Sequence, residues 1–323
     1  MGRLAYIGRV LSSYVFSKNS QLTFWHDIPD INPQAFTKEL GQYYMTFKQK
    51  AAYPGPFDKE EIPLLNYHGK VGIQYNPIAI AQYALGNYNL FGQTDKKIYQ
   101  ERFLKSASWL LNNISVTNCN MYLWPHNFDF EYFRPLKAPW FSGLAQGQGL
   151  SVLIRAYGQT GNSRYLQMAE EVFRTLSIPI DKGGVQYKDS DGFIWIEEYL
   201  VDPPTHILNG FIWALWGIYD YFLFTRSKAA KDIFDDYVRT ILHYLDRYDI
   251  SFWSLYELTP QRLKSVASPF YHQIHIVQMD IMHRLTGYKE FLEYSEKWTE
   301  YSKCLSCRFI AGAYKSLFKI IFY

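Results

Sequence analysis

The sequence predicts a mainly α fold: an α/α toroid of about four helical hairpins with short β-hairpins at one rim. Three observations predict it: apolar helices recur at a nearly constant spacing, an amphipathic helix follows each of them, and long aromatic segments connect successive hairpins. The apolar helices should begin at or just after four prolines, whose residue numbers differ by 62, 65 and 65: Pro77, Pro139, Pro204 and Pro269. In such a ring the apolar helices form a buried inner layer and the amphipathic helices an outer layer that faces water.

The stretch 139–161 predicts the second inner helix. It is apolar almost all round, so we expect it to be buried. Gln146, Gln148 and Arg155 lie within it, and buried polar groups need partners, so at least one side should face a cavity, a ligand or other polar side chains. Each of its interior glycines costs about 1 kcal/mol relative to alanine, which indicates close approach by another backbone or by a substrate. These glycines are Gly143, Gly147 and Gly149.

The outer helices follow from amphipathic patterns. They are predicted over residues 97–112, 163–176, 228–248 and 287–303. The whole chain is then divided into an N-terminal extension, a toroidal catalytic domain and a C-terminal tail, covering residues 1–60, 61–304 and 305–323. The tail is apolar with a few basic residues, and we favour its docking onto the chain's own domain over contact with a membrane surface or a partner.

The connections from each outer helix to the next inner one are long, at residues 115–138, 178–203 and 250–268. Loops of that length in a compact domain are usually functional. All three are aromatic and acidic with short alternating pieces, so we expect β-hairpins that cap the mouth of a cavity.

The composition narrows the classes of ligand and reaction that we expect for this chain. Aromatic residues make up 19% of the chain, including 28 Tyr and 9 Trp, which favours ligands with flat apolar faces such as sugars, with a large aromatic core as the alternative. The net charge of +3 gives no reason to expect nucleic acid and is compatible with an anionic substrate. No P-loop, dinucleotide fingerprint or Gly-x-Ser-x-Gly elbow occurs, so nucleotide and acyl-transfer chemistry are excluded and no cofactor is expected.

Cysteine usage and the chain's apolar stretches bear on metals and location. Cys119, Cys304 and Cys307 make neither a disulfide framework nor a complete metal site, so we expect no metal. The opening residues lack a continuous apolar core and a small-residue cleavage site, and no stretch reaches the roughly 18 apolar residues of a spanning helix. The expected location is therefore cytoplasmic.

The sharpest chemical cluster is Glu197, Glu198 and Tyr199. In a strand the two glutamates point to opposite faces, so one can enter the cavity while the other faces water or a cation. The apolar residues before them suggest a partly buried site, where a carboxylate becomes a stronger base. A solvated acidic turn is the alternative interpretation.

Two tyrosines and two histidines are the next candidates. Tyr256 and Tyr271 are each interpretable as packing residues or as acid/base groups. His272 and His275 lie three apart on one helical face, but no third ligand completes a metal site. We expect these histidines to hydrogen-bond a polar ligand or a neighbouring inner helix.

These residues resemble a known family, the C-terminal region of the D-glucuronyl 5-epimerases that act on heparosan-type polysaccharides. The resemblance covers about residues 62–303 and rests on motifs in the same order along the chain. They are residues 75–83, 138–148, 197–199, 208–211, 217–220, and Tyr271-His followed by His275. The family's α/α toroid agrees with the repeat, and the resemblance implies inversion of carbon 5 of a uronic acid within a glycan chain, D-glucuronate to L-iduronate.

The family uses a glutamate and tyrosines as acid/base groups on opposite ring faces. By resemblance, Glu198 is one acid/base and Tyr271 the other, with Tyr256 supporting and Tyr199 beside them. A wider set is expected to bind substrate: Tyr75, Tyr83, Trp124, Trp140, Gln146, Gln148, Arg155, Asn209, Arg262, His272 and His275. One departure is that the family's Tyr-Asp-Leu-Arg reads here Tyr256-Glu-Leu-Thr259, so the arginine is missing and Arg262 or Lys264 would have to replace it.

Other functions remain open at this level. A uronate polysaccharide lyase shares the proton abstraction, and a glycoside hydrolase on the same toroid needs a second carboxylate, available from Asp129, Glu131 or Glu257. A non-catalytic glycan-binding protein would use the aromatic residues to stack sugars. The expected partner is an anionic uronate-containing polysaccharide, with no nucleic acid, and a homodimer is compatible with the sequence.

Overall fold

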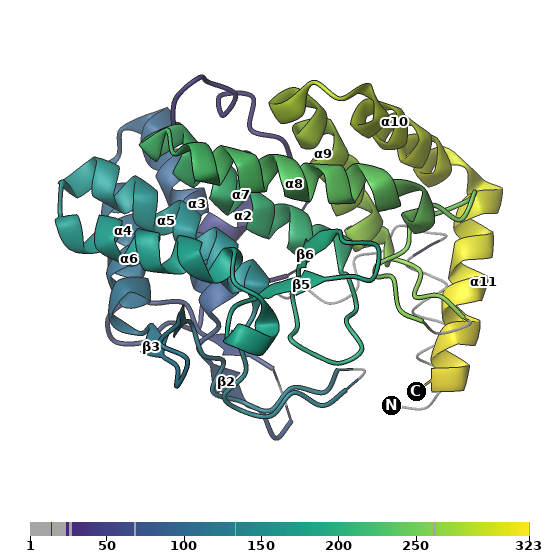
Figure 1. The fold of residues 1–323 in the computed structure, drawn as a ribbon, viewed down its shortest axis with the longest axis horizontal. Coiled ribbons are helices and arrows are strands. Elements are labelled where there is room, and N and C mark those ends of the chain that lie inside the picture. The colour runs from purple at the N-terminus through teal and green to yellow at the C-terminus, as the bar shows by residue number, and fades with distance from the viewer. Residues whose placement is uncertain are drawn as a thin grey trace. The chain divides into compact units, whose positions relative to one another are not determined.

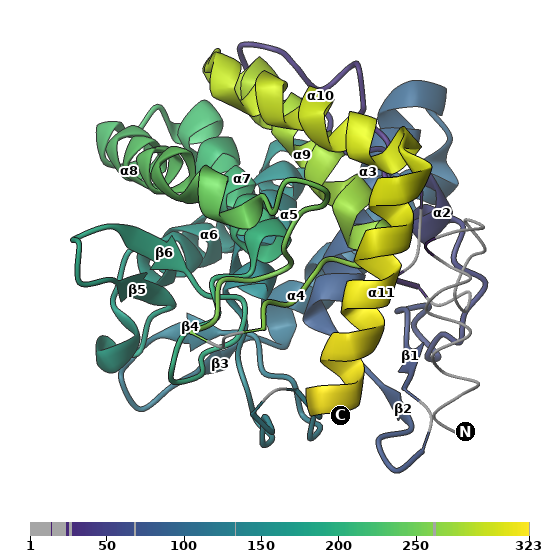
Figure 2. The same cartoon turned by 90° about the vertical axis from the view of Figure 1, so that its right-hand side faces the viewer.

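The computed structural model describes residues 14, 24–25, 28–67, 69–132, 134–260 and 263–322, with the backbone alone for 319, 321 and 322. These residues are mainly helical (Figures 1 and 2). They fall into two compact units. Unit 1 holds the described residues of 1–31 together with 205–209 and 241–322, and unit 2 holds those of 32–204 and 210–240.

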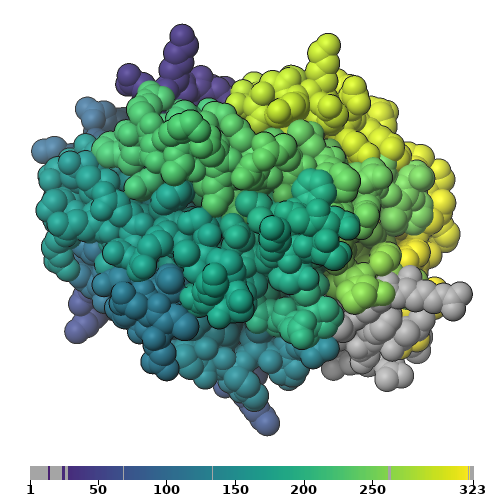
Figure 3. Space-filling view, in the orientation of Figure 1, coloured from purple at the N-terminus to yellow at the C-terminus, as the bar shows by residue number. Residues whose placement is uncertain are grey.

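Unit 2 contains the first three predicted helical hairpins. Its helices, after the short α2 (Lys48–Ala51), are α3 (Pro77–Thr94), α4 (Lys97–Asn112), α5 (Gly143–Thr160), α6 (Ser163–Leu176), and most of α7 (Leu208–Thr225) and α8 (Lys228–Tyr244). The outer helices α4 and α6 have the predicted bounds, whereas α8 ends at Tyr244 and continues as a 3-10 turn, Leu245–Tyr248. The fourth outer helix, predicted over 287–303, spans Lys289–Lys303. Figure 3 shows the side chains of α6 and α8 at the surface.

Three two-stranded antiparallel sheets lie in the connections of unit 2. They are β1 (Leu65–Asn66) with β2 (Ile73–Gln74), β3 (Ser115–Val116) with β4 (Tyr122–Leu123), and β5 (Gln186–Lys188) with β6 (Ile194–Ile196). In the last sheet Tyr187 is the register partner of Trp195. The predicted hairpins in 115–138 and 178–203 are therefore present, whereas the described part of 250–268 holds only isolated bridges.

Unit 1 contains α9 (Pro269–Thr286), α10 (Lys289–Lys303) and α11 (Leu305–Phe322). Helix α11 docks onto other segments of this unit by hydrogen bonds. Arg308 Nε donates to Tyr14 O (2.7 Å), Lys264 N donates to Tyr314 Oη (3.1 Å), and Lys315 Nζ donates to the carbonyl of Val266 (2.6 Å). No helix among the described residues is both long and apolar enough to cross a membrane.

The starts of the inner helices follow the prolines in two of four cases. Helices α3 and α9 begin at Pro77 and Pro269, with the preceding Asn and Ser side chains accepting from backbone N–H groups of the first turn. Helices α5 and α7 begin four residues after Pro139 and Pro204, so the prolines do not mark their starts. For α5 the N-cap is Ser142, whose hydroxyl accepts from Ala145 N.

The glycines of α5 allow close approach, as predicted. A Cβ at Gly147 would lie 2.2 Å from the Cα of Ala214 in α7, and one at Gly143 would lie 2.4 Å from the carbonyl oxygen of Glu197. At Gly149 the obstacle is the Trp124 ring, also at 2.2 Å. Two of the three glycines therefore admit another backbone, and the third admits an indole.

Candidate active site

Strand β6 positions the segment 197–199, which follows it directly. The N–H of Glu197 donates to Val185 O (3.1 Å), and its carbonyl accepts from Gly143 N (3.0 Å) at the start of α5. Both neighbours belong to unit 2, so the backbone of this segment is tied to the sheet on one side and to an inner helix on the other. The site segment is held by rigid elements.

The Trp195 side chain fixes the same strand. Its indole N–H donates to Asp189 Oδ2 (2.9 Å), and its ring centroid lies 5.6 Å from that of Phe211 in α7. Trp195 is 1% exposed, so the end of β6 is anchored in the core of unit 2. Truncation of a large buried aromatic residue to alanine typically lowers the free energy of unfolding by roughly 3–5 kcal/mol.

Both glutamates of the segment are buried. Glu197 is 0% exposed and Glu198 is 5% exposed. The expectation that one of them faces water is therefore wrong for Glu197, because backbone hydrogen bonds on both sides draw that residue into the interior. The interpretation of the segment as a solvated acidic turn is also wrong.

The Glu198 carboxylate lies against the first turn of α7. A Cβ built on Gly210 would be 2.0 Å from Glu198 Oε2 and 2.9 Å from Glu198 Cβ, so only glycine leaves room for this side chain. The Glu198 side chain is therefore held in one position against the α7 backbone.

Tyr199 belongs to an aromatic cluster in unit 2. Its ring lies 4.4 Å from Tyr132, 5.7 Å from Trp140 and 6.1 Å from Phe130. The aromatic members of the cluster are Tyr67, Phe128, Phe130, Tyr132, Trp140 and Tyr199. Aromatic faces of this kind pack against the apolar faces of sugar rings.

Trp140 is anchored within the aromatic cluster by a hydrogen bond and a stacking contact. Its indole N–H donates to Phe128 O (2.9 Å), and its ring stacks on His126 at 3.7 Å and 10°. Burial lowers the pKa of His126 to about 3, so this imidazole is neutral. Trp140 is 7% exposed, and most of its surface is committed to packing.

Tyr256 and Tyr271 meet in unit 1. Their ring centroids are 4.7 Å apart at 57°, and both residues are half-buried. The N–H of Tyr256 donates to Ser265 O (2.8 Å), while Tyr271 lies in the first turn of α9, where its N–H donates to Ser268 Oγ (3.3 Å). The structure brings together the two tyrosines that the sequence singled out separately.

His272 and His275 form a buried cluster with Ser254. The Ser254 hydroxyl lies 2.7 Å from His272 Nδ1 and 2.8 Å from His275 Nδ1, and His272 Nε2 lies 3.0 Å from the carbonyl of Trp298. Burial lowers the pKa of His272 to about 3, and burial together with His272 lowers that of His275 well below its ordinary value. Both rings are neutral and supply no positive charge to a substrate carboxylate.

The hydrogen bonds fix both histidine tautomers. Because a carbonyl only accepts, His272 Nε2 carries the proton, and its Nδ1 accepts from the backbone N–H (3.2 Å) and hydroxyl of Ser254. The hydroxyl has one proton, so His275 Nδ1 must donate to it. That leaves His275 Nε2 as a buried acceptor with no partner found among the described residues.

The glutamines of α5 are bound within unit 2. The amide group of Gln146 donates to Tyr122 O and Thr175 Oγ1, both at 2.9 Å, and its oxygen accepts from Trp124 N (3.1 Å). Gln148 Oε1 accepts from Gln82 in α3 (3.1 Å). These polar side chains of the inner helices pair with other polar groups, one of the three outcomes expected from the sequence.

The remaining predicted residues are scattered. Tyr75 is 40% exposed, stacks on Trp109 and donates to Asp58 Oδ2 (2.7 Å), whereas Tyr83 is 2% exposed. Trp124 is fully buried and donates to Leu110 O (2.8 Å). Asn209, in unit 1, accepts at its carbonyl from Gln278 Nε2 (2.9 Å).

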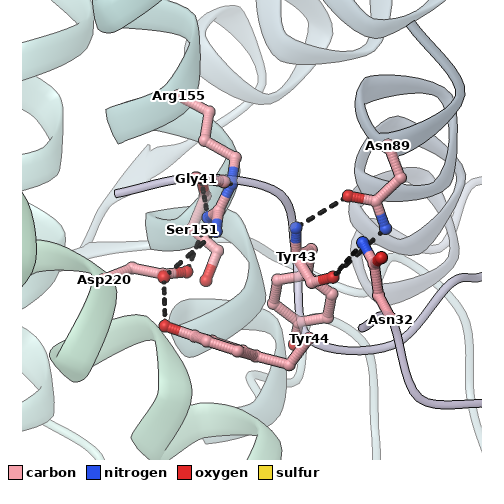
Figure 4. A network of polar contacts seen from close by, with 8 residues as sticks. All are labelled: Asn32, Gly41, Tyr43, Tyr44, Asn89, Ser151, Arg155 and Asp220. Atoms are coloured by element: carbon pink, nitrogen blue, oxygen red, sulfur yellow. Dashed lines mark hydrogen bonds and ion pairs between the residues drawn. The ribbon is translucent and has the colours of Figure 1, made fainter. Parts of the chain in front are cut away.

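Arg155 forms a buried ion pair with Asp220 of α7 (Figure 4). Both side chains are 0% exposed; Arg155 Nη1 lies 2.6 Å from Asp220 Oδ2, and Nη2 lies 3.1 Å from Oδ1. The guanidinium also donates to Gly41 O and Ser151 O, and the Tyr44 hydroxyl donates to Asp220 (2.7 Å). These contacts join α5, α7 and the segment before α2.

Arg262 and Lys264 are the two candidates to replace the missing arginine. Arg262 lies outside the described residues. Lys264 is half-buried and donates from Nζ to Thr259 O at 2.8 Å, in unit 1. Its ammonium group therefore lies in the loop that carries Tyr256.

Sequence reasoning missed three residues of these sites: Gly210, Asp220 and Ser254. Asp220 had a usable signal, because it is an acidic residue inside one apolar helix and Arg155 is a basic residue inside another. Gly210 lies in a motif recognised by resemblance, but its proximity to Glu198 depends on tertiary structure. No group of three or more His, Cys, Asp or Glu side chains among the described residues is placed to hold a metal ion.

Comparison with solved structures defines the fold class. The structure is similar to cellobiose 2-epimerase from Bacillus thermoamylovorans, with a TM-score of 0.57 and 10% identity over 93% of this chain and 87% of that one. At this identity the likeness shows the fold alone, and the chain has the mainly α, α/α toroid fold. The predicted fold class is confirmed.

Sequence comparison then identifies the family. A model of the D-glucuronyl C5-epimerase C-terminus matches residues 117–300, and the chain belongs to this family. A D-glucuronyl C5-epimerase of Caenorhabditis elegans is 27% identical over 178 residues, covering 50% of this chain and 29% of that protein. An uncharacterized protein of Methanocaldococcus jannaschii is 28% identical over 269 residues, 76% of this chain and 86% of the relative. The chain is thus an enzyme of the epimerase type that acts on carbohydrates.

Proposed function

We propose that the chain inverts carbon 5 of D-glucuronate residues within a polysaccharide and so converts them to L-iduronate residues. A base removes the carbon 5 proton from one face of the ring, and an acid returns a proton to the other face. The intermediate is an enolate, so the substrate carboxylate must be stabilised by preorganised donors or cations. Two acid/base groups on opposite faces meet this requirement.

Glu198 is the first of these groups. The observation that carries the proposal is its placement: a buried carboxylate against Gly210 in the first turn of α7, on a backbone fixed at Glu197. A carboxylate that is held in one position and largely excluded from water is a well-placed and stronger proton acceptor. Tyr199 and the aromatic cluster beside it are suited to pack against the sugar ring.

Tyr271 is the second group and Tyr256 its support. A phenol both donates and accepts a proton, so it can act as the acid that reprotonates carbon 5. The ring contact at 4.7 Å restricts both side chains, which reduces the entropy lost on reaching a reactive geometry. The substrate in this proposal is an anionic uronate-containing polysaccharide; a cytoplasmic location and a homodimer stay predictions.

Solvent exchange tests the proposal directly. With a heparosan-type polymer in deuterium oxide, the chain should incorporate deuterium at carbon 5 of uronate residues, observable by NMR or by mass spectrometry of the digested polymer. Glu198→Gln should lower the exchange rate by about 10²–10⁴-fold, the usual contribution of a general base, with polymer binding largely kept. Glu290→Gln, at an exposed acid on α10, is the control and should exchange at the unchanged rate.

The other outcomes separate the rival functions. An unsaturated product that absorbs in the near ultraviolet indicates a lyase, and a new reducing end that is lost in Glu131→Gln indicates a hydrolase. If the polymer binds without exchange and Glu198→Gln changes nothing, the chain is a glycan-binding protein. Absence of exchange with every uronate polymer would contradict the proposal.

A further inference from the structure

Two thiols, Cys304 and Cys307, lie at the junction of α10 and α11 in unit 1. Cys304 is at once the last residue of the α10 hydrogen-bond pattern, donating its N–H to Glu300 O (3.0 Å), and the residue before α11, accepting at its carbonyl from Arg308 N (3.1 Å). Its backbone is extended, with φ −75° and ψ 114°. Cys304 therefore occupies the N-cap position of α11, and Cys307 lies in the first turn of that helix.

The Cys304 sulfur is in hydrogen-bond contact with Ser306, whose hydroxyl lies 3.0 Å from it. A side chain at the N-cap position faces the free N–H groups of the first helical turn, which stabilise a thiolate there. Cys307, three residues later, lies in that same turn.

The hydrogen bonds and burial around the two thiols shift their pKa values in opposite directions. The Ser306 hydroxyl, the Cys307 N–H and the Cys307 thiol lower the pKa of Cys304 to about 7. Burial and the contact with Cys304 raise the pKa of Cys307. Both side chains are partly exposed, so a reagent from solution has access. An exposed thiolate paired with a protonated neighbour is the arrangement of an attacking and a resolving cysteine.

We propose that Cys304 and Cys307 form a redox-active dithiol that exchanges with low-molecular-weight disulfides. The Cys304 thiolate attacks one sulfur of the disulfide, forming a mixed disulfide and releasing one thiolate. Cys307 then gives up its proton to solvent and attacks the Cys304 sulfur, which forms the Cys304–Cys307 disulfide and releases the second thiolate. The protein dithiol loses two electrons and two protons, and the small disulfide is reduced to two thiols.

The site is independent of the proposed epimerase reaction in position and in chemistry. The matched family region ends at residue 300, before Cys304. The third cysteine, Cys119, gives an internal control, because it is exposed and lies in a turn rather than at a helix start. A difference between these thiols reports on the α10–α11 junction and not on general access of the reagent.

Alkylation kinetics test the first step. At pH 7 with a limiting thiol reagent, peptide mass spectrometry should show Cys304 reacting about threefold or more faster than Cys119. This estimate combines a roughly 15-fold gain in thiolate over an ordinary thiol with the loss of intrinsic nucleophilicity that accompanies a lower pKa. Ser306→Ala should slow Cys304 and leave Cys119 unchanged. Equal rates for the two thiols would overturn the inference.

Redox titration tests the second step. The full chain is equilibrated in mixtures of reduced and oxidised glutathione, and intact mass should show the loss of two hydrogen atoms from the wild type. Cys307→Ser should instead accumulate one glutathione adduct at Cys304, and Cys304→Ser should form neither product at this pair. The absence of an internal disulfide at every glutathione ratio would refute a dithiol site. Deuterium exchange into the polymer, measured on the same samples, shows separately whether the epimerase proposal holds.

Discussion

Unit 2 buries acidic side chains in two settings, at Asp220 and at Glu198, that differ in what holds the carboxylate. Asp220 accepts from both terminal nitrogens of Arg155 and from the Tyr44 hydroxyl, so side chains of two other segments use its oxygens. Glu198 is placed by its own backbone segment and by the space over Gly210. The first carboxylate is one half of a structural ion pair, whereas the second is positioned by the packing of its side chain against Gly210 of α7.

Unit 2 buries the carboxylates of Asp220 and Glu198 under different structural conditions. A buried ion pair is compensated only when each charge keeps its partner and its remaining hydrogen bonds are made. Around Arg155 this condition is met by Asp220 and by two backbone carbonyls. A carboxylate for proton transfer needs a fixed position, which the backbone at Glu197 and the packing against Gly210 supply.

The largest expected effect comes from breaking the ion pair. Asp220→Ala leaves Arg155 buried without its counter-ion and should reduce the free energy of unfolding by about 3–5 kcal/mol. Denaturant unfolding followed by circular dichroism measures it. Asp232→Ala is the matched control, because it removes an exposed partner of Lys228 on α8 and should change stability by less than about 1 kcal/mol. Equal losses in the two variants would show that burial of the pair does not matter.

A smaller effect, on activity, should follow from filling the space beside Glu198. In Gly210→Ala the new methyl group occupies the position of Glu198 Oε2, so the carboxylate must move by about 1 Å or more. Such a displacement of a catalytic group typically costs about 10²-fold in rate. Deuterium exchange at carbon 5 is the measurement, and the circular dichroism spectrum should stay native.

Gly158→Ala provides the control within the same layer of helices. Gly158 also lies in an inner helix, but nothing approaches within 4 Å of a Cβ built there. Alanine should therefore keep the exchange rate and raise stability by roughly 0.5–1 kcal/mol through helix propensity. If Gly210→Ala behaves like this control, Glu198 does not depend on that space.

The smallest expected effect is on the pH dependence of unfolding and comes from His272, a buried group that is neutral in the folded chain. The folded-state pKa of His272 is lowered to about 3 by burial, below the ordinary value of about 6.5. As the pH falls below 6.5, the unfolded chain binds a proton that the folded chain does not, which lowers the free energy of unfolding. The contribution of His272 to stability is therefore complete above pH 6.5 and is lost progressively towards pH 3. From pH 6.5 to 5 the loss should be about 2 kcal/mol for this histidine.

Unfolding at several pH values checks the histidine effect. His272→Gln should reduce the slope of unfolding free energy against pH between 5 and 6.5, because its side chain does not titrate. His243→Gln, at an exposed position on α8, should leave the slope unchanged. Identical slopes for the wild type and His272→Gln would mean that the imidazole is protonated in the folded chain.

The sequence predicts the features of the fold that depend on local interactions better than those that depend on distant contacts. The amphipathic outer helices α4 and α6 have the predicted bounds, because their periodicity is a local property of the sequence. The start of α5 was misplaced by four residues, since Ser142 caps the helix and Pro139 lies before the cap. The third rim segment was expected to form a hairpin, yet its described residues make only isolated bridges, such as Leu255 with Val266.

The sequence by itself determined the helical repeat, the family and the segment 197–199 as the chemical candidate. Only the tertiary structure decided that Glu197 is buried, that Arg155 pairs with Asp220, and that Glu198 lies over Gly210. The physical reason is that periodicity and caps act within a few residues, whereas the partner of a buried polar group comes from a distant segment. Residues 155 and 220 belong to different helices, and their meeting depends on how closely α5 and α7 pack at Gly147.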